Sequence, residues 1–102
     1  MNKLAYVILL LCLSAPANAQ SEFDEAKFLA EQGNALAQLN LGIRHTNGEG
    51  VPEDDAEAVK WYRLAAEQGL APAQSYLGIM YGQGDGVPEN YAEAAKWCRL
   101  AA

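Results

Sequence analysis

Few side chains in this sequence could act as catalytic nucleophiles or bases. His45 is the only histidine, and neither Ser21 nor Ser75 begins an S-x-x-K motif that would supply a serine nucleophile. Cys98 has no histidine near it in the sequence to act as a base. His45 itself lies four residues after Leu41 in a helical pattern, which indicates a packing role. We therefore expect no catalytic residue, no enzyme activity and no cofactor.

The acidic residues Glu49, Glu53, Asp54 and Asp55 could instead hold a metal ion. A calcium loop of the EF-hand type needs oxygen ligands at alternating positions, and this run lacks that alternation. Acidic side chains at the start of a helix stabilise its N-terminus, which explains the run better. We expect no bound metal.

Length and charge exclude further functions. The chain has 102 residues, which is enough for one small domain. Its 13 acidic and 7 basic residues give a formal net charge of -6, so it offers no basic stripe to a phosphate backbone. We expect no nucleic-acid partner.

The first 19 residues have the pattern of a cleaved signal peptide. Lys3 supplies a positive charge, residues 4–13 are apolar, and residues 17–19 (Ala-Asn-Ala) resemble a signal-peptidase site. This pattern predicts cleavage between Ala19 and Gln20, and export to the periplasm or the extracellular space. The apolar run is too short to cross a bilayer, which takes about 20 residues, so we expect no permanent membrane anchor.

Loss of the signal peptide would leave Cys98 as the only cysteine. An intrachain disulfide is then impossible. A lone thiol in an exported protein is usually buried and inert. We expect Cys98 to be buried.

An internal duplication dominates residues 20–102. Aligning residues 34–66 with residues 70–102, at an offset of 36, gives 20 identities in 33 positions. The tetrapeptide Ala-Glu-Gln-Gly also recurs, at 30–33 and 66–69. The predicted organisation is a packing helix over residues 20–33, a first repeat over 34–69 and a second repeat, truncated at its end, over 70–102.

Each repeat is predicted to fold as two antiparallel helices. Residues 20–102 hold 15 alanines and only six β-branched residues, a composition that favours an all-α fold. The first helices start at Asn34 and near Pro72, and the second helices start at the capping residues Asp54 and Asn90. Gly42 lies in mid-helix and recurs 36 residues later, which predicts close helix packing in both repeats.

This pattern resembles the Sel-1-like repeat, a relative of the tetratricopeptide repeat. The resemblance covers residues 34–102 and rests on a set of residues that fall in register with the repeat. They are Leu41, Gly42, Gly48, Gly50, Val51, Ala58, Trp61, Tyr62, Ala65, Ala66 and Gly69. His45 and Cys98 stand where the repeat usually has tyrosine, and the sequence stops before the closing glycine. The resemblance implies a right-handed superhelix of antiparallel helix pairs that binds a protein or peptide.

Two alternatives to a protein-binding module stay open. Some exported, cysteine-rich members of the family resemble proteins described as β-lactamases, which would make this chain an exported hydrolase. Those members place paired cysteines in their repeats, and this chain lacks such pairs. The other alternative is a truncated fragment without a function of its own.

Two surfaces are predicted to bind partners. In such a superhelix the first helix of each pair lines the inner groove, where side chains vary between repeats. The candidate groove residues are Leu39, Asn40, Ile43, Arg44, Ser75, Tyr76, Ile79 and Met80. The second surface is the last helix, where we expect Trp97 and Leu100 to be exposed and available for self-association.

Overall fold

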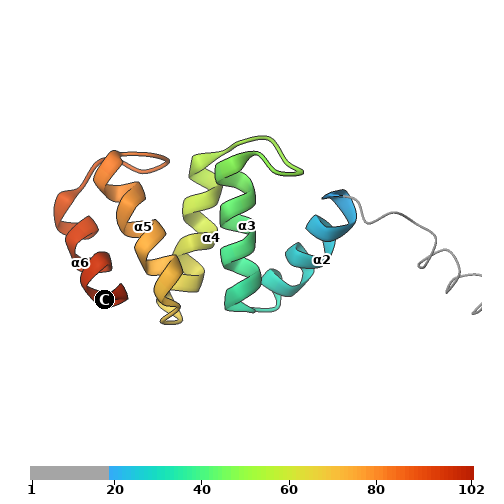
Figure 1. Ribbon diagram of the computed structural model, residues 1–102, viewed down its shortest axis with the longest axis horizontal. Helices are drawn as coiled ribbons and strands as arrows, with labels where there is room; N and C mark the ends of the chain where they lie inside the picture. Colours follow the sequence, from blue (N-terminus) through green and yellow to red (C-terminus); the bar gives the residue numbers. More distant parts are fainter. Residues whose placement is uncertain (1–18) are drawn as a thin grey trace, which may run out of the picture.

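All five elements of residues 19–102, the part of the chain that the computed structural model describes, are α-helices, which confirms the all-α prediction. They are α2 (Ala19–Glu31), α3 (Ala35–Asn47), α4 (Asp55–Glu67), α5 (Ala71–Gln83) and α6 (Tyr91–Ala101). Figure 1 shows consecutive helices running antiparallel and standing side by side in one row. The described residues form a solenoid of two helix pairs, α3 with α4 and α5 with α6, preceded by α2.

The predicted signal peptide, apart from Ala19, lies outside the described residues. α2 begins at Ala19, beside the predicted cleavage site between Ala19 and Gln20. Cleavage stays a prediction. None of the helices within residues 19–102 has the length and apolar character needed to span a membrane.

Side-chain caps determine where most of the helices begin. At the start of α3, Asn34 Oδ1 accepts a hydrogen bond from the backbone N–H of Ala37 at 2.9 Å. Asp54 and Asn90 cap α4 and α6 in the same way, each accepting from the N–H three residues later at 3.1 Å. α5 lacks a side-chain cap and has Pro72 in its first turn instead. All four helix starts agree with the prediction from sequence.

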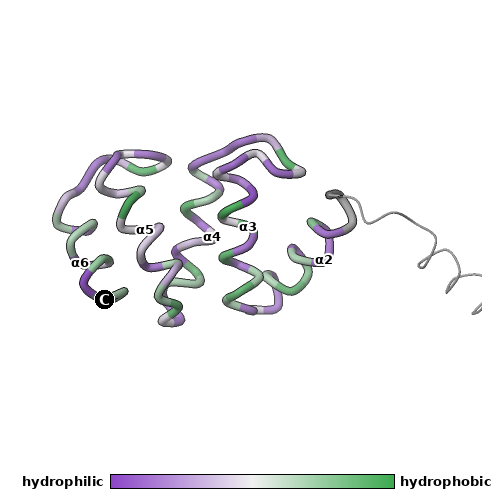
Figure 2. Tube along the Cα trace, in the orientation of Figure 1, coloured by the Kyte–Doolittle hydropathy of each residue, from purple (hydrophilic) through white to green (hydrophobic). Residues whose placement is uncertain are grey.

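The hydrophobic core follows the row of helices. Figure 2 shows hydrophobic and hydrophilic residues interspersed along the helices, as expected for helices that bury one face. A smaller cluster joins α2 to α3 and contains Ala30, Ala37 and Leu41. The larger cluster joins α4, α5 and α6 and contains Ala58, Val59, Tyr62, Ala65, Ala66, Ala73, Leu77, Met80 and Trp97.

Two glycines let the helices of each pair approach closely, as predicted. The ring of Tyr62 lies so near Gly42 that a methyl group there would overlap it. In the second pair, a methyl group at Gly78 would lie 2.7 Å from Cys98 Sγ. Cys98 is nonetheless exposed, so the prediction that it is buried was wrong. The equivalent Tyr62 is covered by Tyr76 of the next helix, whereas no described helix packs on the outer side of α6.

Two buried glutamines tie successive units together, which the sequence analysis did not foresee. Gln38 Nε2 donates to the carbonyl oxygen of Ala30 at 3.1 Å, and Gln74 Nε2 donates to that of Ala66 at 3.2 Å. Gln68 Nε2 donates to Gln38 Oε1 at 2.8 Å. Because a buried amide needs hydrogen-bond partners, these bonds specify how each helix pair sits on the helix before it.

Candidate functional site

The predicted groove residues differ in how far they reach solvent. The exposed ones are Asn40, Ser75, Tyr76 and Ile79, and the half-buried ones are Leu39, Ile43 and Arg44. Met80 is only 5% exposed and belongs to the larger core cluster, so the prediction that it lines the groove was wrong. Its unbranched apolar side chain packs between helices, whereas Arg44 at the equivalent position of α3 keeps its charge near the cleft described below.

Several exposed apolar side chains lie on the first helices of the two pairs. Leu36 of α3 is 67% exposed, and Tyr76 and Ile79 of α5 are 40% and 48% exposed. At an offset of 36, Ile79 matches the half-buried Ile43, which lies seven residues after Leu36 and on the same side of α3. These residues, Leu36, Ile43, Tyr76 and Ile79, form what we call the groove face.

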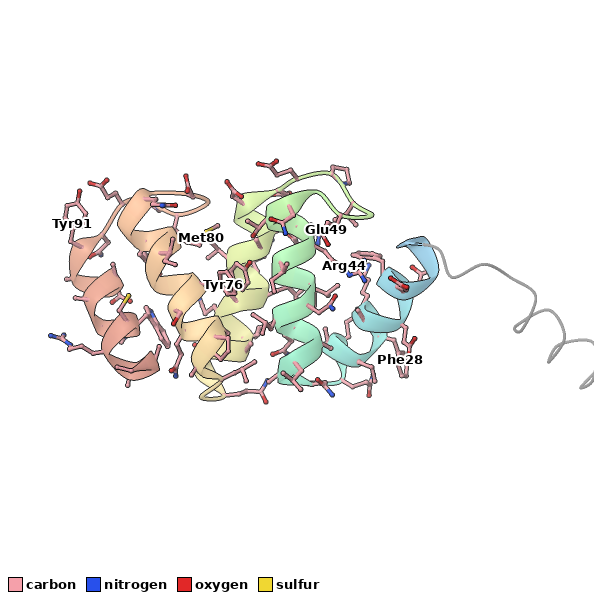
Figure 3. All side chains as sticks on the ribbon, viewed as in Figure 1. Phe28, Arg44, Glu49, Tyr76, Met80 and Tyr91 are labelled. Carbon is pink, nitrogen blue, oxygen red and sulfur yellow. The ribbon has the colours of Figure 1, made fainter. Side chains whose placement is uncertain are left out.

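Tyr76 of the groove face stacks on Tyr62, a buried residue of α4. The rings of Tyr62 and Tyr76 lie 5.0 Å apart and are 9° from parallel (Figure 3 labels Tyr76). Thr46 Oγ1 donates to the carbonyl oxygen of Gly42 and lies 2.9 Å from the Tyr62 hydroxyl oxygen. Because a threonine hydroxyl has a single hydrogen, the Tyr62 hydroxyl is the donor of the second bond.

Burial of the Tyr62 ring gives the protein a predicted sensitivity to alkaline pH. Burial raises the pKa of Tyr62 above its ordinary value, because the charged phenolate is poorly solvated there. Because the pKa of Tyr62 is higher in the folded than in the unfolded state, its protonated side chain contributes fully to the free energy of unfolding below the unfolded pKa of about 10. This contribution declines as the pH rises through the folded pKa. We expect Tyr62→Phe to flatten the decline of the free energy of unfolding above about pH 10.

This prediction is checked by urea denaturation at a series of pH values. Tyr62→Phe loses about 0.5–1.5 kcal/mol at neutral pH with the Thr46 bond, so the two stability curves should converge as the pH rises. Tyr91→Phe removes a phenol from the exposed surface of α6 and serves as the control. Parallel curves for the native protein and Tyr62→Phe would contradict the assignment.

The cleft between α2 and α3 has a volume of about 430 Å³. Figure 1 shows α2 diverging from α3 toward its N-terminal end, which opens this space. Its lining residues, on both helices and the turn between them, are Glu22, Glu25, Ala26, Leu29, Asn34, Leu36, Ala37, Asn40 and Arg44. The cleft thus includes two of the predicted groove residues, Asn40 and Arg44.

Arg44 is the main polar group inside this cleft. Its side chain is 14% exposed and points toward α2 (Figure 3). Arg44 Nε donates to Asn40 Oδ1 at 2.7 Å, and a terminal nitrogen lies 3.4 Å from Glu22 Oε2. These contacts hold the guanidinium against the cleft wall.

The sequence analysis missed the α2 side of this cleft. Glu22, Ala26 and Leu29 belong to the packing helix, and only residues 30–33 of that segment were aligned with the later repeat. Extending the offset of 36 toward the N-terminus would have placed Ala26 opposite Tyr62. That exchange of a large residue for a small one is the signal that could have identified the cleft.

His45 is a packing residue in the structure, as predicted. Its ring is half-buried and meets the ring of Phe23 edge-on, with centroids 6.1 Å apart. Its Nδ1 is buried and makes no hydrogen bond. Within residues 19–102, no three His, Cys, Asp or Glu side chains gather in a group that could hold a metal ion.

Of the two residues of α6 that were predicted to be exposed, one is buried. Trp97 is only 7% exposed and packs in the larger core cluster, so its prediction was wrong. Trp97 packs with Leu77 and Met80 of α5 because it lies on the apolar stripe of α6, one turn after Ala94. Leu100 is 55% exposed, in agreement with the expectation for this residue.

Comparison with known proteins gives this arrangement a context. A family model described as Sel1 repeat matches residues 35–70 and 71–102. The secretory immunoglobulin A-binding protein EsiB of Escherichia coli is 56% identical over 53 residues, which make up 52% of this chain and 11% of EsiB.

Two crystal structures share the fold. A protective antigen of uropathogenic Escherichia coli strains that displays an SLR fold matches with a TM-score of 0.81 and 49% identity, over 82% of this chain and 18% of the antigen. A Sel1 repeat protein from Oxalobacter formigenes matches with a TM-score of 0.84 and 41% identity, over 94% of this chain and 41% of that protein. The chain therefore spans less than half the length of each of these relatives.

Proposed function

The chain belongs to the Sel1 repeat family, and from this premise we propose that it is a protein-interaction module that binds a protein or peptide partner through its groove face. The observation that carries this proposal is the exposure of Leu36, Tyr76 and Ile79 on the first helices of the two pairs. Apolar side chains gathered on one face favour a partner that covers them. Its relative EsiB is a secretory immunoglobulin A-binding protein, so a repeat protein of this family with a protein partner has a precedent.

The proposal includes export, which rests on the sequence of residues 1–19. We infer that the partner is met outside the cytoplasm. No catalytic activity is proposed, because His45 packs against Phe23 and Cys98 is without a second cysteine after residue 19. The hydrolase alternative has no supporting observation among the described residues.

Photo-crosslinking at the groove face tests this function. A photoreactive amino acid at Ile79 should capture a recurrent partner from the exported fraction, while the same group at the exposed Lys60 of α4 should not. With that partner purified, Leu36→Ser and Ile79→Ser should each weaken binding about tenfold or more, because each removes buried apolar area from the interface.

Leu64→Ser is the matched control, since Leu64 is an aliphatic residue of α4 that is 45% exposed. Its affinity for the partner should stay unchanged. Equal losses of affinity for all three variants, or no loss for any of them, would contradict the assignment of the groove face.

A further inference from the structure

We propose that the cleft between α2 and α3 binds a tyrosine side chain of an extended peptide segment, with basic residues beside that tyrosine. This inference rests on the proposed function and names the chemistry of the partner. The supporting observation is a difference between the α2–α3 interface and the α4–α5 interface of this protein.

The interface between α4 and α5 repeats the interface between α2 and α3 at the offset of 36 residues. In the α4–α5 interface, the rings of Tyr62 and Tyr76 stack 5.0 Å apart and fill the space between the helices. At the matching positions of the α2–α3 interface, the chain has Ala26 and Asn40. Both residues line the cleft of about 430 Å³. The cleft therefore lies where two aromatic rings lie in the other interface.

The walls of the cleft suit an aromatic ring with a polar end. Leu29 and Leu36 are 39% and 67% exposed and offer apolar contacts on either side. Asn40 and Arg44 follow Leu36 along α3, about one and two turns further from the turn that joins α2 to α3. Aromatic side chains of this kind gain most of their binding energy from apolar contact, and a buried hydroxyl needs a hydrogen-bond partner.

Arg44 can supply that hydrogen bond. It replaces Met80 of the second repeat, and its guanidinium carries five N–H donors, of which two take part in the contacts to Asn40 and Glu22. The same kind of contact occurs elsewhere in the molecule, where Arg63 donates to the hydroxyl of Tyr81. A phenol oxygen is thus an acceptor that this chain already pairs with arginine.

The charge at the cleft favours basic neighbours on the peptide. Glu22 and Glu25 line the cleft and are both exposed, while Arg44 is its one cationic lining residue. The whole chain has a formal net charge of -6. Complementary charge at the rim of an interface accelerates association and suppresses binding of acidic segments.

Fluorescence anisotropy with labelled peptides tests the proposal on the purified protein. The probes are Ala-Lys-Tyr-Lys-Ala, the same peptide with alanine in place of tyrosine, and the same peptide with glutamate in place of both lysines. We expect the first peptide to bind about tenfold or more tightly than either of the others.

A variant that fills the cleft supplies the matched comparison. Ala26→Tyr combined with Asn40→Tyr introduces the pair of side chains found in the α4–α5 interface, and it should weaken binding of the lysine-tyrosine peptide about tenfold or more. Circular dichroism checks that the variant is folded. NMR of the unsubstituted protein gives a second readout, in which the peptide should shift the methyl signals of Leu29 and Leu36 but leave those of Leu64 unchanged.

The outcomes separate this inference from the proposed function. Equal binding of the tyrosine and alanine peptides, or methyl shifts confined to residues outside the cleft, would overturn the tyrosine site. If the crosslinked partner still binds the cleft-filled variant while Ile79→Ser weakens it, the groove face stands and the tyrosine site falls. If the peptide binds the cleft and Ile79→Ser, which lies outside the cleft, leaves partner binding unchanged, the tyrosine site stands and the groove face falls.

Discussion

Gly86→Ala should lower the free energy of unfolding by about 2–5 kcal/mol, a large share of the total for a small domain. Gly86 lies between α5 and α6 with φ of +72°, a left-handed conformation that costs a residue with a side chain about 1–2 kcal/mol. A methyl group there would also overlap the backbone of Asp55 and lie 2.9 Å from Ala56 N. Since backbone cannot move aside as a flexible side chain can, overpacking adds about 1–3 kcal/mol.

Gly69→Ala separates these two costs. Gly69 has φ of +91°, and a methyl group there would have no neighbour within 4 Å. This variant should therefore lose only the backbone cost of about 1–2 kcal/mol. Urea denaturation of both variants measures the difference. Equal losses would show that the contact between the Gly86 loop and the start of α4 does not restrict the residue at position 86.

Tyr62→Ala is expected to lower the free energy of unfolding by about 3–5 kcal/mol, because it removes a large side chain that is only 1% exposed. The ring fills the space beside Gly42 and stacks against Tyr76. Its loss leaves a cavity between the two helix pairs and leaves Tyr76 without its support. Thermal and urea unfolding should both register the change.

A double-mutant cycle with Gly42→Ala tests whether the ring is the cause. In the native background, Gly42→Ala forces its methyl group against the Tyr62 ring and should cost about 1–3 kcal/mol. In the Tyr62→Ala background that overlap is gone, so the same substitution should cost much less or add stability. Additive effects in the cycle would contradict the close contact between Gly42 and Tyr62.

The repeat pattern predicted the elements well because it records local requirements of the backbone. Asn34, Asp54 and Asn90 cap helices in the structure because short polar side chains bond free N–H groups at helix starts wherever they occur. The mid-helix glycines likewise revealed close packing, since only such packing offsets their cost in a helix.

The same pattern predicted single side chains less well. Met80 and Trp97 are buried and Cys98 is exposed, contrary to expectation. A repeat shows which positions correspond, but the burial of one side chain depends on the size of the residue opposite it on the next helix. Tyr62 is covered because Tyr76 follows it, whereas Cys98 has no described helix beyond it.

Only the α3 side of the candidate site was predicted from the sequence. Asn40 and Arg44 were found because they differ between the repeats, but their partner wall on α2 was not. Ala26 and Asn40 line the cleft, and both are smaller than their counterparts Tyr62 and Tyr76. Such a hollow arises from two residues on different helices, so neither residue reveals it alone.

The row of helices has a mechanical consequence. The extensive contacts join only consecutive helices, from α2 to α3, α3 to α4, α4 to α5 and α5 to α6. A pulling force along the row would therefore act on each interface in series. The weakest interface would part first while the others stayed closed. The cleft leaves the interface between α2 and α3 less filled than the interface between α4 and α5, so we expect α2 to separate from α3 before the other interfaces part.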